Sequence, residues 1–193
     1  MCDVSDTGAY CLDIGCCDGE FFLQLAPCFP NSTFLGVDIS ESLVRTATDE
    51  SKDMANVAFQ VQSATSLPDD WSDRFNIVFM VETLHDLPFP RDTLRECYRV
   101  LSPGGVLSVV DINITSSLAE QKKEAMGSVS TYAFSLYHCL STALATPDAE
   151  GLGTCVGFQT LKQLIQEAGF HNVLVKDVPG NPSVVHFVAE KPS

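Results

Sequence analysis

The sequence predicts a single α/β domain built on a doubly wound, mostly parallel sheet. Between residue 9 and residue 114, strand-like apolar stretches alternate with helix-like stretches, as in parallel sheets with right-handed crossovers. A second observation is the turn after the first strand, residues 15–19, which begins and ends with glycine. The 193 residues, 45% of them hydrophobic, suffice for one well-buried domain but not for two large ones, so we expect a single domain over 1–193.

The expected elements follow from hydrophobic spacing and from turn residues. Helices are expected between successive strands and again near the C-terminus, over 19–26, 40–53, 88–105 and 160–170. The helix over 88–105 is expected to end at Pro103, Gly104 and Gly105. Strands are expected at 9–14, 33–37, 56–64, 75–81, 106–114, 171–178 and 183–190, with the last two antiparallel at the sheet edge because a short turn joins them.

The alternation stops between residues 116 and 148. This stretch is helical by composition and carries apolar residues at helical spacing, namely Met126, Val129, Tyr132, Ala133, Leu136 and Leu140. We expect a helical insertion that forms the roof of the substrate site. An extra packing helix without ligand contact explains the spacing equally well.

The glycine turn after the first strand indicates a nucleotide-binding corner. Such a turn lets the backbone approach a ligand closely and points helix N–H groups at it. A dinucleotide fingerprint would need glycine at positions 15, 17 and 20, and only Gly15 fits. The S-adenosylmethionine pattern (acidic, apolar, Gly, x, Gly, x, Gly) places Asp13, Gly15 and Gly19 correctly and departs only at Cys17. The alternative is a turn that merely joins a strand to a helix.

Polar residues follow the second and fourth strands. Asp38, which follows the second strand, is expected to accept hydrogen bonds from ribose hydroxyls, although it or Ser40 could instead cap the next helix. The fourth strand breaks into Glu82, His85 and Asp86. Ligands of open parallel sheets bind past the carboxyl ends of the strands, so this cluster is expected to face cofactor and substrate.

Composition excludes several classes of partner. The net charge of −14, with only 11 Lys and Arg, opposes nucleic-acid binding. No apolar run approaches the roughly 18 residues of a membrane span and no secretory signal is evident, so we expect a cytoplasmic protein without membrane contact. The eight cysteines are expected to be free thiols, and the four histidines show no zinc spacing, so no metal is predicted.

As a group, the motifs resemble those of the class I S-adenosylmethionine-dependent methyltransferases. The matching segments are CLDIGCCDG, FLGVDIS, QSATSLP, FNIVFMVETLHDLP, RVLSPGGVLSVVD and LIQEAGF. The resemblance implies a Rossmann-like sheet of seven strands with the last one antiparallel, and S-adenosylmethionine as cofactor. The segments LHDLPFP, STYAFSLYHCLSTALA and GLGTCVG look more narrowly like a small-molecule subgroup that carries an N-terminal winged-helix-like domain.

The resemblance also assigns cofactor-binding positions. It implies that Asp13, Gly15, Cys17 and Gly19 border the methionine part, Asp38 the ribose with Ile39 beside it, Ser63 and Ala64 the adenine, and Val81 and Glu82 the sulfonium. Two features depart from the family pattern. Cys17 puts a side chain where the backbone should approach the cofactor. The first strand also begins about nine residues from the start, so the upstream region is expected to be missing.

The expected function is methyl transfer from S-adenosylmethionine to a small-molecule acceptor. If the acceptor is a hydroxyl or a thiol, His85 or His138 could serve as general base. The fourth strand ends without an Asn/Asp-Pro-Pro-aromatic signature, which disfavours amino methylation of nucleobases or glutamine. The alternatives are a methyltransferase-like domain that binds cofactor or a partner without turnover, and a nicotinamide oxidoreductase, which the glycine spacing disfavours. A homodimer is also considered.

Overall fold

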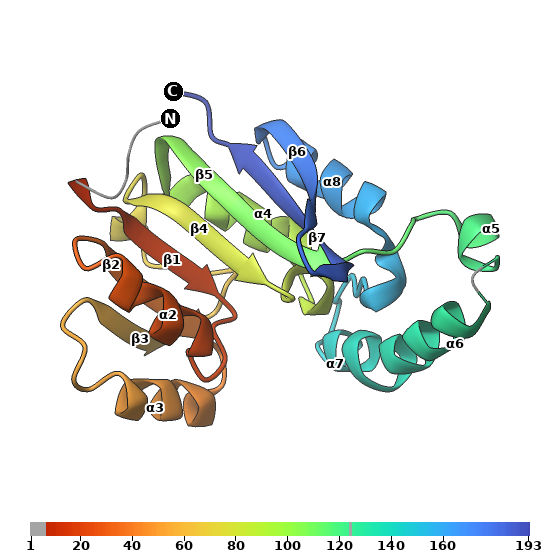
Figure 1. Ribbon diagram of the computed structural model, residues 1–193, viewed down its shortest axis with the longest axis horizontal. Helices are drawn as coiled ribbons and strands as arrows, with labels where there is room; N and C mark the ends of the chain where they lie inside the picture. Colours follow the sequence, from red (N-terminus) through yellow and green to blue (C-terminus); the bar gives the residue numbers. More distant parts are fainter. Residues whose placement is uncertain (1–6, 124) are drawn as a thin grey trace.

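The protein folds around one seven-stranded sheet, seen in a computed structural model that describes residues 7–123 and 125–193 (Figure 1). The strand order is β3-β2-β1-β4-β5-β7-β6, and only β7 runs antiparallel to its neighbours. The predicted doubly wound sheet with an antiparallel last strand is therefore confirmed. The strands are β1 (Tyr10–Ile14), β2 (Thr33–Asp38), β3 (Val57–Val61), β4 (Phe75–Val81), β5 (Leu101–Ile112), β6 (His171–Val178) and β7 (Asn181–Glu190).

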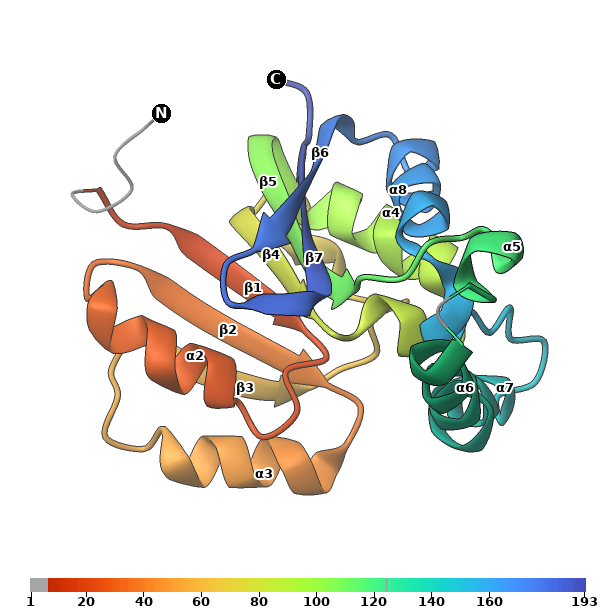
Figure 2. The same ribbon diagram turned by 45° about the vertical axis from the view of Figure 1, so that its right-hand side comes forward.

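Helices cover both faces of this sheet (Figures 1 and 2). On one face α2 (Glu20–Leu25) and α3 (Glu41–Glu50) bury Phe22, Val44 and Ala47 in one apolar cluster. On the other face α4 (Pro90–Val100) and α8 (Phe158–Glu167) contribute to a larger cluster. The short 3-10 turns are η1 (Ala26–Cys28), η2 (Asp69–Trp71), η3 (Leu84–Asp86) and η5 (Thr154–Val156).

The predicted end of the helix over 88–105 is wrong. Helix α4 ends at Val100, and residues 101–105 already belong to β5. A residue that precedes proline is biased toward extended backbone, so Pro103 favours the strand from Ser102 onward. Leu101 is fully buried as expected, but it pairs with Phe75 across the sheet. Residues 101–105, which were expected to end a helix, therefore begin a strand.

The helical insertion consists of α5 (Leu118–Gln121), α6 (Ala125–Phe134), the π-helical segment η4 (Ser135–Cys139) and α7 (Leu140–Leu144), and it projects beside the sheet (Figure 2). Its predicted apolar face is not its buried face. Val129 and Leu136 are 69% and 60% exposed, whereas the row Ser135, Cys139 and Ala143 is buried. Small side chains permit close approach of the helix backbone, so this row makes the contact. The side chain of Met126 lies outside the described part.

The structure bears on the expected absence of a membrane span and on the state of the cysteines. No helix within the described residues is long and apolar enough to cross a membrane. All seven described cysteines are free thiols, and five of them are at least partly buried. The predicted cytoplasmic location stays a prediction.

One side chain of α4 anchors the connection between β3 and β4. Arg99 donates hydrogen bonds to the carboxylate of Glu96, to the carbonyl oxygens of Leu67 and Pro68, and to the hydroxyl of Ser72. Glu96 in turn accepts from the backbone N–H of Leu67. The hydrogen bonds from Arg99 and Leu67 lower the pKa of Glu96 below its ordinary value of 4.5.

Replacing this anchor should destabilise the fold. We expect Arg99→Ala to lower the free energy of unfolding by about 1 to 3 kcal/mol, because several half-buried acceptors lose their donor. The matched control is Arg95→Ala on the same helix, where the exposed guanidinium pairs with Asp92 alone among the described residues. This control should change stability by less than about 0.5 kcal/mol. Urea unfolding measures both, and equal effects would contradict the anchoring role. Because the pKa of Glu96 is lowered, the difference between Arg99→Ala and the parent should be full above pH 4.5 and shrink as the pH falls below it.

Candidate functional site

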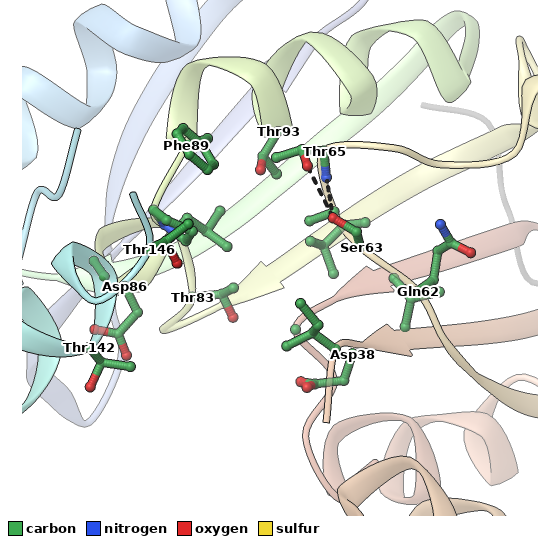
Figure 3. Close-up of a pocket in the computed structure, with 18 of the residues that line it drawn as sticks. Asp38, Gln62, Ser63, Thr65, Thr83, Asp86, Phe89, Thr93, Thr142 and Thr146 are labelled. Atoms are coloured by element: carbon green, nitrogen blue, oxygen red, sulfur yellow. Dashed lines mark hydrogen bonds between the residues drawn. The ribbon is translucent and has the colours of Figure 1, made fainter. Parts of the chain in front are cut away.

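A cavity of about 480 Å³ opens at the carboxyl ends of β1, β2, β3 and β4. Parallel sheets bind ligands at this edge, and the volume lies within the usual range of about 300 to 1,000 Å³ for small-molecule sites. Figure 3 shows Asp38, Gln62 and Ser63 on one side of the cavity and Asp86, Phe89 and Thr142 on the other, with Thr83 between them. The lining residues are Ile14, Gly15, Cys17, Val37, Asp38, Ile39, Gln62, Ser63, Ala64, Thr65, Glu82, Thr83, Asp86, Leu87, Pro88, Phe89, Thr93, Thr142, Ala143 and Thr146.

The glycine corner after β1 is bonded directly to the end of β2. The N–H groups of Gly15 and Cys16 both donate to the carbonyl oxygen of Val37, at 2.8 and 3.0 Å. Gly15 has a φ of +75°, and a Cβ at this position would lie 2.5 Å from Cγ2 of Thr83. Both the backbone conformation and the space require glycine here. Thr83 therefore lies against the corner across the floor of the cavity.

Cys17 adopts the backbone conformation that the family pattern assigns to glycine. Its φ is +49°, in the left-handed region that side chains rarely occupy. Its N–H donates to Oδ2 of Asp38 at 3.0 Å, and its exposed side chain lines the cavity. The turn is thus kept in spite of the substitution, and the side chain of Cys17 lies at the cavity.

Asp38 receives two backbone hydrogen bonds at the end of β2. Besides the bond from Cys17, its Oδ1 accepts from the N–H of Ser40 at 2.8 Å. The N-cap of α3 is Ser40, whose hydroxyl accepts from the N–H of Leu43. Asp38 is therefore not the helix cap. A carboxylate has about four lone-pair sites, so Asp38 retains acceptors for a ligand.

Three predicted cofactor residues do not line the cavity. Gly19 has a packing role, because a Cβ there would lie 2.4 Å from the ring of Phe59. Val81 is partly exposed but not in the lining. Asp13 is buried in the sheet, and its Oδ1 has no hydrogen-bond partner among the described residues. Burial and then the charge of Asp38 raise the pKa of Asp13 well above its ordinary value.

Ile39, Ser63 and Ala64 lie together at the β2–β3 side of the cavity. Ile39 is 79% exposed, which is unusual for an isoleucine beside a cavity. The hydroxyl of Ser63 lies 3.0 Å from that of Thr65, and one can donate to the other. This side of the cavity offers a ligand apolar contact from Ile39 and Ala64 and hydroxyl groups from Ser63 and Thr65.

The residues of the polar cluster after β4 do not all face the cavity. Glu82 and Asp86 line the cavity, whereas His85 is 3% exposed and does not. Nδ1 of His85 lies 2.8 Å from Oδ1 of the buried Asp111, and its Nε2 lies 3.3 Å from Oδ1 of Asp86. Burial opposes protonation of His85, but the hydrogen bond and charge of Asp111, with the charges of Asp86 and Glu82, raise its pKa above the ordinary 6.5.

His138 is not brought to the cavity. It lies on the exposed side of η4 with its ring 5.3 Å from that of Phe134. The part of the insertion that does reach the cavity is α7 with the turn after it, through Thr142, Ala143 and Thr146. Sequence reasoning missed these residues. Their signal is the spacing of Thr142 and Thr146 by four positions, which in a helical sequence pattern predicts two hydroxyls on the same side.

The charges around the cavity are all negative. Among the described residues that line it, the ionisable side chains are Asp38, Glu82 and Asp86 with the thiol of Cys17, and no lysine, arginine or histidine occurs. Such a lining repels anions and favours neutral or cationic ligands.

Comparisons with known proteins agree with this geometry. A family model described as a methyltransferase domain matches residues 5–170. The ubiquinone biosynthesis O-methyltransferase of Pseudomonas putida strain F1 is 30% identical over 111 residues, which are 57% of this chain and 47% of that protein. Its counterpart from the Dugway strain of Coxiella burnetii is 33% identical over 107 residues, 55% of this chain and 44% of that protein. The chain spans about half the length of the curated relatives it matches.

Solved structures share the fold. An S-adenosylmethionine-dependent methyltransferase from Methanosarcina mazei superposes with a TM-score of 0.71 at 22% identity, covering 97% of this chain and 94% of that one. The CurJ carbon methyltransferase gives 0.71 at 20% identity and 96% and 49% coverage. The [4+2]-cyclase SpnF gives 0.70 at 19% identity and 98% and 77% coverage.

The family match covers most of the chain, so this protein belongs to the class I S-adenosylmethionine-dependent methyltransferases. This agrees with the preference for an S-adenosylmethionine corner over a dinucleotide one. The described residues fit the implied cofactor. The cavity has acceptors at Asp38 and carboxylates for a cationic group, and at Gly15 the close approach of Thr83 leaves no room for a side chain at the corner. The narrower subgroup stays a prediction.

Thiol labelling can locate the cofactor without an activity assay. Cys17 and Cys28 are the two exposed thiols among the described residues, and only Cys17 lines the cavity. Burial and then nearby carboxylates raise the pKa of Cys17, so labelling with a maleimide is best done above neutral pH. We expect S-adenosylhomocysteine to protect Cys17 at least several-fold and to leave Cys28 unchanged, as measured by peptide mass spectrometry. Equal protection of both, or of neither, would contradict the placement.

The ribose position can be tested through Asp38. We expect Asp38→Asn to weaken binding of S-adenosylmethionine about 10- to 100-fold in calorimetry, because hydrogen bonds to a charged acceptor contribute about 1.5 to 3 kcal/mol. Asp49→Asn on the exposed face of α3 is the matched control and should bind like the parent. If both variants bind equally well, Asp38 has no ribose role.

Proposed function

We propose that this protein transfers a methyl group from S-adenosylmethionine to a small-molecule acceptor. The observation that carries the proposal is that one cavity joins the glycine corner to α7 of the insertion, so a cofactor and a second ligand have room side by side. The family match supports the reaction class.

In this proposal the cofactor occupies the β1–β2–β3 side of the cavity. Asp38 accepts from the ribose hydroxyls, and Ile39 and Ala64 hold the adenine between apolar surfaces. Ser63 offers the adenine a hydroxyl. Gly15 lets the backbone approach the methionine part, and Glu82 faces the sulfonium charge. These roles rest on the positions of the residues around one cavity.

The acceptor occupies the opposite side, beside Asp86, Phe89, Thr142 and Thr146. The three carboxylates of the lining and its lack of cationic side chains favour a neutral or cationic acceptor over a carboxylate or phosphate. The net charge of −14 argues in the same direction against a nucleic acid. Phe89 and Leu87 offer apolar contact, and the two threonines offer hydroxyls to a polar group.

The chemistry places modest demands on the protein. The cofactor supplies an activated methyl group on a positively charged sulfur. The chain's own residues hold the two ligands in line and exclude water, and such positioning supplies up to about 7 to 11 kcal/mol in favourable systems. The base role predicted for His85 requires Asp86 between the imidazole and the cavity, and that for His138 requires the insertion to move. Both stay predictions.

A domain that binds the cofactor without turnover is the alternative. SpnF, a cyclase of similar fold, illustrates that the fold alone does not fix the reaction. Cys17 is the feature of this chain that favours the alternative, because its side chain enters the cavity. A homodimer is also consistent with the exposed side chains of Val129, Leu136 and Tyr137 on the insertion.

A matched acceptor panel tests both the reaction and the acceptor charge. We expect release of S-adenosylhomocysteine with neutral or amine-bearing small phenols and alcohols, and at least about tenfold slower turnover with the same scaffolds bearing a carboxylate. Mass spectrometry of the methylated product measures the outcome, with Asp38→Asn as the control for cofactor dependence. Cofactor binding without transfer to any acceptor would favour the alternative, and a preference for the anionic member of each pair would contradict the assigned charge.

A further inference from the structure

Three metal-ligating side chains meet at the junction of η3 and the insertion. His85 and Asp86 come from the turn after β4, and Cys139 comes from η4, more than fifty positions later in the sequence. One ligand atom from each lies within 4.8 Å of the other two. His85 and Cys139 are buried, while Asp86 lines the cavity and its side chain is 38% exposed. The cluster is thus closed on one side and opens toward the cavity.

The carboxylate of Asp111 fixes the orientation of His85. Oδ1 of Asp111 lies 2.8 Å from Nδ1, and Oδ2 of the same carboxylate accepts from the backbone N–H of His85 at 3.3 Å. Since a carboxylate only accepts, Nδ1 carries the hydrogen and Nε2 points away from Asp111. A buried carboxylate that orients a histidine in this way is the usual outer partner of a metal-binding imidazole.

The atoms in front of Nε2 are electron-rich. Oδ1 of Asp86 lies 3.3 Å away and is buried, and the Asp86 carboxylate lies within reach of the thiol of Cys139. Sγ of Cys139 accepts a hydrogen bond from the hydroxyl of Thr154 at 2.9 Å, so this sulfur also has an outer partner. A nitrogen, an oxygen and a sulfur that face one another offer a cation three ligand atoms.

We propose that His85, Asp86 and Cys139 bind a divalent transition-metal ion of the zinc class, with Asp111 and Thr154 as outer partners. Zinc takes nitrogen, oxygen and sulfur ligands at about 2.0 to 2.3 Å, and three protein ligands with one open position are typical of its catalytic sites. Tetrahedral ligands would lie about 3.5 Å apart. Nε2 of His85 and Oδ1 of Asp86 are already 3.3 Å apart, and all three ligand atoms lie within 4.8 Å of one another. Binding replaces the thiol proton of Cys139, which passes to water.

This ion would connect two parts of the fold. Cys139 belongs to the insertion and His85 follows β4, so coordination would fasten the insertion to the sheet beside the cavity. The sequence analysis predicted no metal because positions 85, 86 and 139 do not form a spacing motif. Only the fold brings these three residues together.

Cobalt(II) is the probe, because its colour reports ligand type independently of any methyl transfer. We expect the EDTA-treated chain to bind one Co²⁺ per molecule, with visible bands of four-coordinate geometry and a near-ultraviolet thiolate-to-cobalt band. Added Zn²⁺ should remove both signals by competition. Cys139→Ser should lose the thiolate band, and Cys97→Ser, which alters a buried thiol on α4, should keep it. Asp111→Asn should weaken Co²⁺ binding about 10- to 100-fold.

Several results would overturn the proposal. These are sub-stoichiometric Co²⁺ uptake, a thiolate band that persists in Cys139→Ser, or equal affinity in Asp111→Asn and the parent. Circular dichroism of each variant confirms folding, and Cys139→Ser changes only sulfur to oxygen. Calorimetry of S-adenosylmethionine in EDTA separates this proposal from the proposed function. Cofactor binding that persists without metal leaves the proposed function intact whatever the cobalt titration gives.

Discussion

The site depends on the way the first turn is tied to the second strand. The N–H groups of Gly15 and Cys16 share the carbonyl oxygen of Val37, and the N–H of Cys17 donates to Asp38. These bonds satisfy three successive backbone donors of the turn that precedes α2. They also fix the carboxylate of Asp38 relative to the turn. The geometry of the cavity floor therefore follows from one short stretch of backbone and the register of β1 on β2.

This dependence explains why Cys17 is tolerated. The conformation of the turn is set by its hydrogen bonds and by the glycine requirement at Gly15, which Thr83 enforces. A left-handed non-glycine residue costs about 1 to 2 kcal/mol, which the bond to Asp38 offsets in part. The side chain of Cys17 is then directed into open space at the cavity. The departure from the family pattern alters the surface of the site and leaves its frame unchanged.

The sheet and the residues at its strand ends could be predicted because they depend on local pattern. Apolar runs bounded by turns define the strands, and Asp38 and Glu82 lie at the cavity because Asp38 ends β2 and Glu82 directly follows β4. His85 was placed by the same reasoning, but η3 turns its ring inward onto Asp111. The single turn of η3 decides whether His85 or Asp86 faces the cavity, and sequence spacing does not determine how that turn is oriented.

The insertion could not be predicted in the same way. Hydrophobic periodicity selects large apolar residues, whereas Ser135, Cys139 and Ala143 make the contact because they are small. The π-helical segment also changes the direction in which successive side chains point between α6 and α7, so one regular helical wheel cannot predict the buried face of both helices. The end of α4 has a simpler explanation. Pro103 biases the residue before it toward extended backbone, and this bias outweighs the helix-end signal of Gly104 and Gly105.

The cavity is built from two separately encoded halves. Its sheet half is constrained by register, by glycine and by buried strands, so few exchanges are permitted there. Its other half joins η3 and the start of α4 to the peripheral insertion, which contributes only small and hydroxyl-bearing side chains, namely Thr142, Ala143 and Thr146. Exchanges along that row reshape one compartment while the nucleotide compartment stays intact. Such modularity makes the 116–148 segment the place where ligand preference can diverge among paralogues or be redesigned in the laboratory.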